Sequence, residues 1–416
     1  MWQFRSVLRA DDLMEAARRR IGSADFGDIP FQTGLEVFLR ACAEEADLSL
    51  FGQLGTRWDI LRFLTNLLRM RQEEQRAPEI LQQRVERPIF ITGVPRSGTT
   101  FLHQLLTADS TNIIPRVWQL IHPYVEANRD PARDTRQHRV ARQLWMFQIL
   151  TPEFRRMHPI KADSPQECSE INAHIFASLR FDSTYAVPSY RKWLDEAGHF
   201  DAYRFHRRFL QHLQHQSGDD RRWVLKCPDH IFALDTIRAI YPDARFVFVH
   251  RDPLRVLASV ARLTEVLRRP FTRHVDRPAL GHQELERWSS GTELMIRAAD
   301  EDPFAEPIFH VQYSELVADP LGTVEALYRH FGLTLDPAAA SAIARMVEAK
   351  PNGGYGTNHA GLDAYRIDSV AARERFAPYL ARFGIAREPT PAGVPRPQPS
   401  IGSRPVVALA RRRSSG

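Results

Sequence analysis

The stretch at residues 88–109 constrains the fold more than any other part of this sequence. It opens with an apolar run at residues 89–91 that contains two β-branched isoleucines, which is typical of a short buried strand. Gly93 and Gly98 then bound a loop, and after Thr99 the apolar residues recur at helical spacing. Backbone N–H groups converge where such a loop meets a helix N-terminus, and that arrangement binds phosphate. The stretch therefore predicts a phosphate-binding loop in an α/β fold, although a turn without a ligand would have the same outline.

One position separates this loop from the loop that binds nucleoside triphosphates. The triphosphate loop reads G-x-x-x-x-G-K-[ST], and its lysine reaches the β- and γ-phosphates. Here Thr99 stands in place of that lysine, and the positive charge is Arg96, inside the loop. A guanidinium makes planar, two-pronged contacts with phosphate or sulfate. The sequence therefore favours a single 5′-phosphate that carries a second anionic group over a magnesium triphosphate.

The rest of the chain alternates short apolar strands with helices. Further strands are expected at residues 223–226, 245–250 and 308–313. This alternation is typical of an α/β protein with a mainly parallel sheet flanked by helices. Another helix is expected to begin at Ser164, because Glu167 lies three residues later and completes a capping box.

Three segments are expected along the chain. Residues 1–85 carry helical patterns without strand signals, and we expect a helical N-terminal lead-in that packs on the core. Residues 86–388 are expected to form the α/β domain, of the P-loop type. Pro, Arg and Ser dominate residues 389–416, which predicts a largely disordered tail.

Composition indicates which cellular compartment and which binding partners to expect. The three cysteines are far apart and form no C-x-x-C pair, which argues against disulfides and zinc and for a reducing compartment. The first residues have no secretory apolar region, and no stretch approaches 18 apolar residues. We therefore expect a cytoplasmic protein with no transmembrane segment.

The excess of 56 Lys and Arg over 50 Asp and Glu suits anionic ligands. The basic cluster at residues 133–142 lacks interleaved aromatic residues, so no nucleic-acid partner is expected.

The loop Gly93-Val-Pro-Arg-Ser-Gly-Thr-Thr100 resembles the 5′-phosphosulfate loop of sulfotransferases that use 3′-phosphoadenosine 5′-phosphosulfate (PAPS). The resemblance implies that PAPS is the co-substrate and that no metal is needed. It also assigns cofactor binding to seven loop residues: Gly93, Pro95, Arg96, Ser97, Gly98, Thr99 and Thr100.

A second segment resembles the part of this family that binds the 3′-phosphate. Arg251 follows a predicted strand, and Ser259 lies eight residues later, two turns into the predicted helix. The family uses an arginine and a serine at this spacing, and both groups are good phosphate ligands. In the family, a glycine-rich and basic segment near the C-terminus also approaches this phosphate. Its less regular counterpart here contains three candidates: Lys350, Asn358 and His359.

Other stretches extend the resemblance to bacterial sulfotransferase family proteins over about residues 10–388. They are Trp223-Val-Leu-Lys-Cys-Pro-Asp-His, Tyr241-Pro-Asp-Ala-Arg, Val317-Ala-Asp-Pro and Arg373-Glu-Arg-Phe-Ala-Pro-Tyr. The resemblance implies in-line transfer of a sulfuryl group to a hydroxyl, or an amine, of a small acceptor. Such a transfer needs cations and hydrogen-bond donors where charge develops. Arg96 and Thr99 are expected at the leaving phosphate and Lys226 at the sulfuryl or bridging oxygen, unless Lys226 is only a surface lysine.

A hydroxyl acceptor also requires a general base. Relatives often carry a glutamate in a Trp-Glu-Leu-like segment, but Gln119 stands there in this chain, and an amide cannot take the proton. Four other residues are candidates for the base: Glu170, His122, Glu167 and His158. The apolar and aromatic residues at 176–193 are expected to line the acceptor pocket, which fits a lipid or aromatic acceptor.

Two other functions stay open. Gln119 is compatible with a homologue that binds PAPS or its product without transferring the sulfuryl group. A P-loop kinase or nucleotide hydrolase would need a lysine at the position of Thr99 and a carboxylate for magnesium. The sequence leaves the acceptor and the oligomeric state open.

Overall fold

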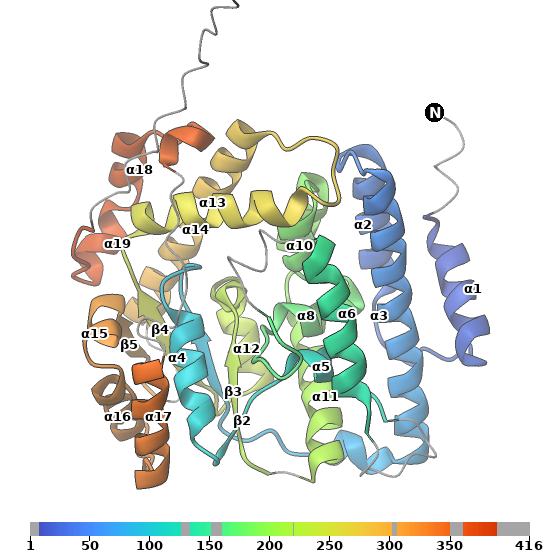
Figure 1. Ribbon diagram of the computed structural model, residues 1–416, viewed down its shortest axis with the longest axis horizontal. Coiled ribbons are helices and arrows are strands. Elements are labelled where there is room, and N and C mark those ends of the chain that lie inside the picture. Colours follow the sequence, from blue (N-terminus) through green and yellow to red (C-terminus); the bar gives the residue numbers. More distant parts are fainter. Residues whose placement is uncertain are drawn as a thin grey trace, which may run out of the picture.

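A parallel β-sheet forms the centre of the molecule in the computed structural model (Figure 1). The structure describes residues 8–125, 134–150, 160–218, 220–301, 306–349 and 361–388. The strands follow the order β2-β3-β1-β4-β5, and all four pairings between neighbours are parallel. Their bounds are Ile89–Thr92 (β1), Asn112–Ile113 (β2), Arg222–Lys226 (β3), Arg245–His250 (β4) and Phe309–Gln312 (β5). The predicted α/β class with a mainly parallel sheet is confirmed.

The central strands are buried on both faces, which explains their continuous apolar sequences. Every residue of β1 and of β4 is buried. Ile89 and Ile91 face one hydrophobic cluster, whereas Phe90 between them faces another. This is the alternation expected of successive side chains along a strand.

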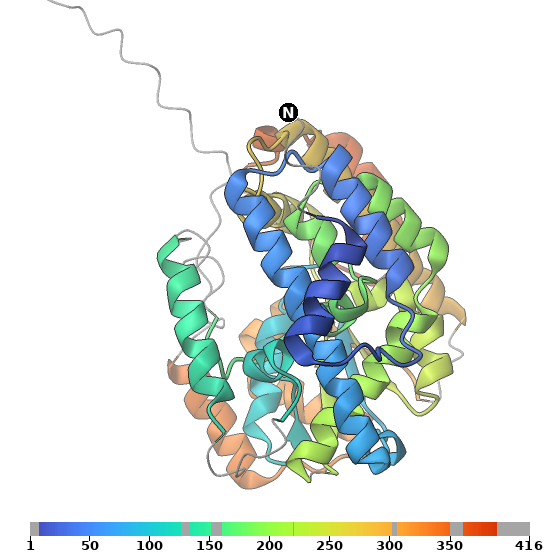
Figure 2. The same cartoon turned by 90° about the vertical axis from the view of Figure 1, so that its right-hand side faces the viewer.

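Helices cover both faces of the sheet (Figures 1 and 2). The cluster around Ile89 is supplied by α4 (Thr99–Leu105), α16 (Pro320–His330) and α17 (Pro337–Ala349). The cluster around Phe90 is supplied by α11 (Phe200–Ser217), α12 (Leu234–Ile240), α13 (Pro253–Arg268) and α14 (Arg277–Glu301). Three N-terminal helices share this second cluster: α1 (Ala10–Ile21), α2 (Gln32–Glu44) and α3 (Leu50–Arg76).

Shorter elements complete the described chain. The α-helices are α5 (Val117–Ile121), α6 (Arg136–Leu150), α8 (Ser169–Asn172), α9 (Arg180–Thr184), α10 (Pro188–Ala197), α15 (Tyr313–Ala318), α18 (Ser369–Arg375) and α19 (Ala377–Arg382). Five 3-10 turns are η1 (Pro78–Gln82), η2 (Leu106–Ala108), η4 (Ala173–Ile175), η5 (Pro228–Ala233) and η7 (Leu362–Tyr365). Figure 2 shows α6 standing out from the body of the molecule on one side.

The register brings the carboxyl ends of the central strands to one edge of the sheet. Ile91 of β1 lies opposite Lys226 of β3 and Val247 of β4. The loop after β1, the end of β3 and the segment after β4 therefore meet at this edge. Open α/β sheets bind their ligands there.

Two local features differ from the sequence expectations. The helix predicted from Ser164 is wrong, because residues 164–168 are irregular and α8 begins only at Ser169. The side chain of Glu167 forms an ion pair with Lys226 instead of the expected capping box. The strand β2 was not predicted, since two residues carry no periodicity. Within the described ranges no helix is long and apolar enough to cross a membrane.

Candidate active site

The loop between β1 and α4 packs so tightly that its two glycines have no room for side chains. Gly93 has a φ of 148°, and a Cβ atom there would lie 2.3 Å from the carbonyl oxygen of Val249 in β4. Gly98 has a φ of 101°, and its Cβ would lie 2.8 Å from the ring of Tyr313. Glycine adopts such backbone angles readily, whereas other residues do not. Arg96 also has a positive φ, of 65°, which a non-glycine residue adopts only at a cost.

A buried hydroxyl inside this loop fits an anionic ligand. Ser97 is completely buried, and its Oγ has no hydrogen-bond partner among the described residues. A buried polar atom without a partner is costly, so unsatisfied atoms in a folded protein often mark a ligand site. A phosphate oxygen would accept a hydrogen bond from Ser97 Oγ. The loop is therefore suited to the phosphate group that its sequence predicts.

Arg251 extends from the end of β4 toward the loop. Its Nη1 donates to the carbonyl oxygen of Arg96 at 3.0 Å, and its guanidinium carbon lies 3.7 Å from the centre of the Tyr313 ring. Nε and Nη2 each donate to one carboxylate oxygen of Glu388 at 2.8 Å. The guanidinium is thus held in place by the loop and the aromatic ring, and its outer edge receives a planar anion.

Ser259 completes this group of predicted phosphate ligands. It lies two turns into α13, a helix that begins at Pro253 after the capping residue Asp252. Arg96 Nε donates to Ser259 Oγ at 3.3 Å. Arg96 comes from the loop after β1, and Arg251 and Ser259 come from the segment after β4, and the fold brings these two segments into contact.

Lys226 lies at the end of β3 with its ammonium group directed at α4. Nζ donates to Thr100 Oγ1 at 3.2 Å and forms an ion pair with Glu167. Only 3% of the Lys226 side chain is exposed, which excludes an ordinary surface lysine. A buried ammonium must be paired, and here its partners are a hydroxyl and a carboxylate at the sheet edge.

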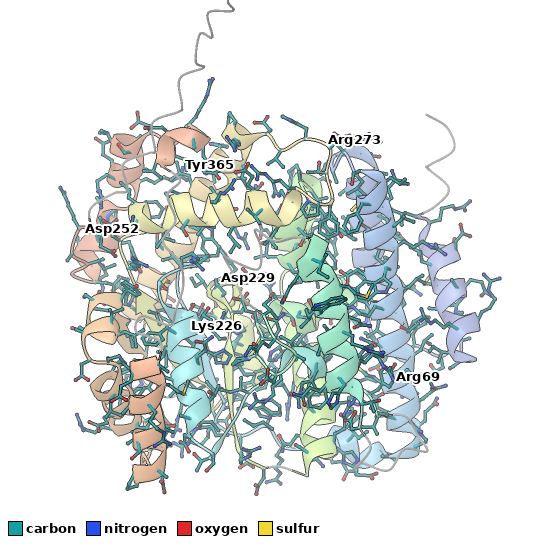
Figure 3. The ribbon with its side chains drawn as sticks, in the orientation of Figure 1. Arg69, Lys226, Asp229, Asp252, Arg273 and Tyr365 are labelled. Carbon is teal, nitrogen blue, oxygen red and sulfur yellow. The ribbon has the colours of Figure 1, made fainter. Side chains whose placement is uncertain are left out.

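Arg96, Arg251 and Ser259 line a cavity of about 420 Å³, whereas Ser97 and Lys226 lie behind its wall. Ligand pockets typically have volumes of about 300–1,000 Å³. The wall contains eight of the predicted site residues: Pro95, Arg96, Gly98, Thr99, Thr100, Glu167, Arg251 and Ser259. Parts of α9, α13 and α14 also contribute to the wall. Figure 3 shows Lys226 and Asp229 at the centre of the molecule, with α13 above them in the view.

Two of the predicted bases lie in surroundings that disfavour proton transfer. Glu170 is buried, accepts a hydrogen bond from Arg62 Nη2 at 2.6 Å and forms an ion pair with Arg180 Nε at 2.7 Å. Burial lowers the pKa of His122 to about 4, and neither ring nitrogen has a hydrogen-bond partner in the described chain. Neither residue is part of the wall of the 420 Å³ cavity. Gln119 is also engaged elsewhere, because its Oε1 accepts from Arg116 N at 2.9 Å.

Four predicted site residues lie outside the described residues. They are the base candidate His158 and the phosphate-ligand candidates Lys350, Asn358 and His359. The described chain contains no group of three or more His, Cys, Asp or Glu side chains that would hold a metal ion.

The sequence interpretation missed two carboxylates in the cavity wall, Asp229 and Glu284. Asp229 lies in η5, three residues after Lys226. Burial raises the pKa of Asp229 to about 7, and the negative charge of Glu167 contributes in the same direction, against Arg287. The rule that ligands bind beyond the carboxyl ends of parallel strands would have pointed to Asp229 as well as to Lys226.

Comparison with known proteins agrees with this arrangement. A sequence model of the sulfotransferase family matches residues 88–337, which include the loop, Lys226, Arg251 and Ser259. The chain belongs to the sulfotransferase family. The predicted resemblance is therefore confirmed.

Two solved structures of mycobacterial sulfotransferases are similar to this chain over most of its length. Sulfotransferase STF1 of Mycobacterium tuberculosis H37Rv is 31% identical, with a TM-score of 0.78 over 90% of this chain and 100% of that one. Sulfotransferase STF9 of Mycobacterium avium is 27% identical, with a TM-score of 0.82 over 93% of this chain and 99% of that one.

A curated relative has a defined acceptor. Omega-hydroxy-beta-dihydromenaquinone-9 sulfotransferase Stf3 of Mycobacterium bovis and of Mycobacterium tuberculosis is 24% identical over 261 residues. The match covers 59% of this chain. The chain spans 63% of the length of that relative.

Proposed function

We propose that this sulfotransferase moves the sulfuryl group of PAPS to a hydroxyl group of a lipid-soluble acceptor. One observation carries the proposal. The loop residues Arg96, Thr99 and Thr100 line one cavity together with Arg251 and Ser259, two segments that the family resemblance assigns to opposite ends of PAPS. The location of the protein in the cytoplasm remains a prediction of the sequence.

The predicted cofactor-binding residues divide into two phosphate sites in this proposal. Ser97, Thr99, Thr100 and the loop N–H groups would hold the 5′-phosphosulfate, because hydroxyls and a helix N-terminus bind anions. Arg251 and Ser259 would hold the 3′-phosphate, with contributions from Lys350, Asn358 and His359 as predicted. When bound, PAPS supplies an activated sulfuryl group.

Lys226 and Arg96 would stabilise the charge that develops during transfer. Both are cations at the sheet edge beside the loop, and preorganised charges of this kind contribute most to such catalysis. The ion pair with Glu167 keeps the Lys226 ammonium at Thr100. Glu167 therefore acts as a positioning residue in this account.

Asp229 would be the general base. Its carboxylate lies in the cavity wall, and a pKa of about 7 lets it take a proton from a hydroxyl at neutral pH. Glu167 is less suited to this role, because its carboxylate is already paired with Lys226. The base then need not occupy the position of Gln119.

The acceptor class is supported by the relative that covers part of this chain. Stf3 carries an omega-hydroxy menaquinone in its name, which is a hydroxyl on a lipid. In this chain the cavity wall also contains Val260, Leu263 and Trp288. These apolar side chains fit the hydrocarbon part of an acceptor.

The test is a transfer assay with ³⁵S-labelled PAPS. The acceptor panel should contain long-chain isoprenoid alcohols, hydroxylated quinols, a sugar and a peptide with tyrosine. We expect ³⁵S in the alcohol or quinol products, and no ³²P in them when the donor is ATP labelled with ³²P in its γ-phosphate. Transfer to the sugar or the peptide alone would contradict the lipid acceptor. Binding of PAPS without transfer to any acceptor would favour a non-catalytic homologue.

A further inference from the structure

Exposed apolar side chains gather on two helices of this molecule. The described chain exposes ten large hydrophobic side chains, and seven of them belong to the first turns of α3 or the last turns of α6. Scattered single hydrophobic residues are normal on a protein surface, whereas a cluster marks an interaction site. These two groups therefore indicate a surface that binds another molecule.

The group on α3 forms a stripe along one side of the helix. Leu50, Leu54 and Trp58 are spaced four residues apart and are 63%, 57% and 53% exposed. Residues four apart lie on the same face of a helix. Phe51 lies beside them, 43% exposed, with its ring 5.9 Å from that of Phe271.

This stripe borders the proposed active site. Ser49 N donates to the carbonyl oxygen of Phe271 at 2.8 Å, which ties the start of α3 to the chain just after α13. Thr56 Oγ1 donates to the hydroxyl of Tyr185 at 3.1 Å. Tyr185 directly follows Thr184, a residue of the cavity wall. The first turns of α3 thus adjoin the α9 and α13 side of the cavity.

The group on α6 lies on its outward face. Val140 and Leu144 face inward and pack with residues of α5. Trp145, Met146 and Ile149 face outward and are 64%, 61% and 58% exposed. In both views the C-terminal end of α6 lies at the same end of the molecule as the first turns of α3 (Figures 1 and 2).

The charges beside the α6 group are mainly positive. Residues 135–150, which include α6, contain three arginines and a histidine but no Asp or Glu, and Asp134 before them pairs with Arg136. The α3 group has charges of both signs beside it, because Arg57 lies among its residues while Asp47 and Asp59 flank them. Arg142 is exposed on α6 one turn before Trp145. Apolar side chains flanked by cations complement a surface that is apolar inside and anionic outside.

We propose that the outward faces of α3 and α6 dock this protein on an anionic lipid surface. Trp58 and Trp145 would lie at the level of the headgroups, where tryptophan is favoured because its ring is apolar and its N–H is polar. The leucines, Met146 and Ile149 would enter the acyl region, and Arg142 would meet anionic headgroups. A lipid-soluble acceptor would then reach the cavity without crossing water, a consequence that rests on the proposed function.

Vesicle flotation tests the docking directly, without donor or acceptor. The wild-type chain is mixed with vesicles of phosphatidylcholine alone or with a third of phosphatidylglycerol. We expect flotation with the anionic vesicles, a marked decrease in high salt, and at least a tenfold loss in the variant W145Q/M146Q/I149Q. A second variant, L50Q/L54Q/W58Q, should lose binding as well.

The matched control removes two exposed apolar residues elsewhere, in the variant L81Q/V370Q. Leu81 and Val370 are 44% and 68% exposed, outside both helices. Each variant must melt at the wild-type temperature. Equal flotation of the α6 variant and this control would overturn the proposal, as would a wild type that never floats.

A sedimentation measurement separates the lipid surface from a second copy of the chain. If the face is covered by another subunit, the wild type sediments as a dimer and the α6 variant as a monomer. That outcome would overturn docking on lipid. Failure of the ³⁵S transfer assay would leave the flotation result unchanged, so the two proposals fail independently.

Discussion

Arg251 and Glu388 form a two-pronged ion pair at the place where we propose that the 3′-phosphate binds. The carboxylate of Glu388 presents two oxygens to Nε and Nη2, as a phosphate would. Arg251 and Glu388 are 17% and 29% exposed, so the pair is partly shielded from water. A phosphate ligand would have to displace Glu388 from the guanidinium.

Substituting Glu388→Gln should therefore strengthen binding of adenosine 3′,5′-bisphosphate. A partly exposed ion pair is worth about 0.2–1 kcal/mol, which corresponds to a Kd lower by about 1.4- to 5-fold. Titration calorimetry on the two proteins measures the change. The matched control is Glu286→Gln, which removes a similar carboxylate from Arg375 away from the cavity. Weaker binding in the Glu388 variant would mean that this carboxylate does not compete with the ligand.

Asp229 gives a prediction about catalysis. Asp229→Asn should lower kcat by roughly 10²- to 10⁴-fold, the usual contribution of a general base. Binding of the bisphosphate should stay near wild type. The base is active when deprotonated, so kcat/KM of the wild type should rise as pH increases through about 7. This rise should be absent in the Asn variant.

The comparison variant is Glu167→Gln. It should lower kcat through the loss of Lys226 positioning and retain the rise of kcat/KM with pH. The opposite result, with the rise lost in Glu167→Gln and kept in Asp229→Asn, would identify Glu167 as the base.

Among the elements, those with strong local patterns were predicted and those fixed by distant partners were not. The strands β1, β3 and β4 were expected within a residue of their bounds, because burial on both faces gives continuous apolar runs. The helix expected from Ser164 fails because the side chain of Glu167 pairs with Lys226, far along the sequence. A capping box is a pattern of neighbouring residues, so it does not reveal that a distant residue such as Lys226 binds the same side chain.

The candidate site follows the same rule. Arg96, Arg251 and Ser259 were predicted as phosphate ligands from motif spacing, and the fold brings them into contact. Glu388 was missed because its ion pair with Arg251 joins residues 137 positions apart. The contact between Glu170 and Arg62 could not be predicted from the sequence either, since Arg62 lies on α3, 108 positions away. Sequence spacing identifies the ligands of a family but not the contacts that occupy a carboxylate.

The junction of α3 and α11 gives a prediction about stability. Burial alone would raise the pKa of Glu74, but hydrogen bonds from His212 and Arg208 outweigh it and lower that pKa to about 2. A lowered carboxyl pKa stabilises the fold at pH values above the ordinary value, near 4.5, and this contribution is lost as pH falls toward 2.

Substituting Glu74→Gln should lower the free energy of unfolding at pH 7 by about 3–5 kcal/mol, because Arg208 and His212 keep their places without the charge between them. Thermal unfolding at pH 7 and at decreasing pH measures the difference, which should shrink below pH 4.5. The exposed pair of Glu286 serves again as control, and Glu286→Gln should change stability by less than about 1 kcal/mol. A difference independent of pH would refute the assigned pKa.

On the scale of the whole molecule, the charged groups and the apolar surface around the cavity come from different elements. The loop after β1 and the segments after β3 and β4 supply the charged groups, and the helices around the opening supply apolar surface. Helix α3 supplies side chains of both kinds, because Arg62 forms a buried ion pair with Glu170 while Trp58 is exposed on the surface. We therefore expect the N-terminal helices to be inseparable from function.

The central claim is that the cavity binds an adenosine with phosphates at both the 3′ and 5′ positions. Titration calorimetry with adenosine 3′,5′-bisphosphate and with magnesium ATP, on the wild type and on Arg251→Ala, tests it most directly. The account predicts micromolar binding of the bisphosphate, at least a tenfold weakening in Arg251→Ala, and no binding of ATP. Binding of ATP but not of the bisphosphate would contradict the account, and would mean that Arg96 and Thr99 serve a triphosphate.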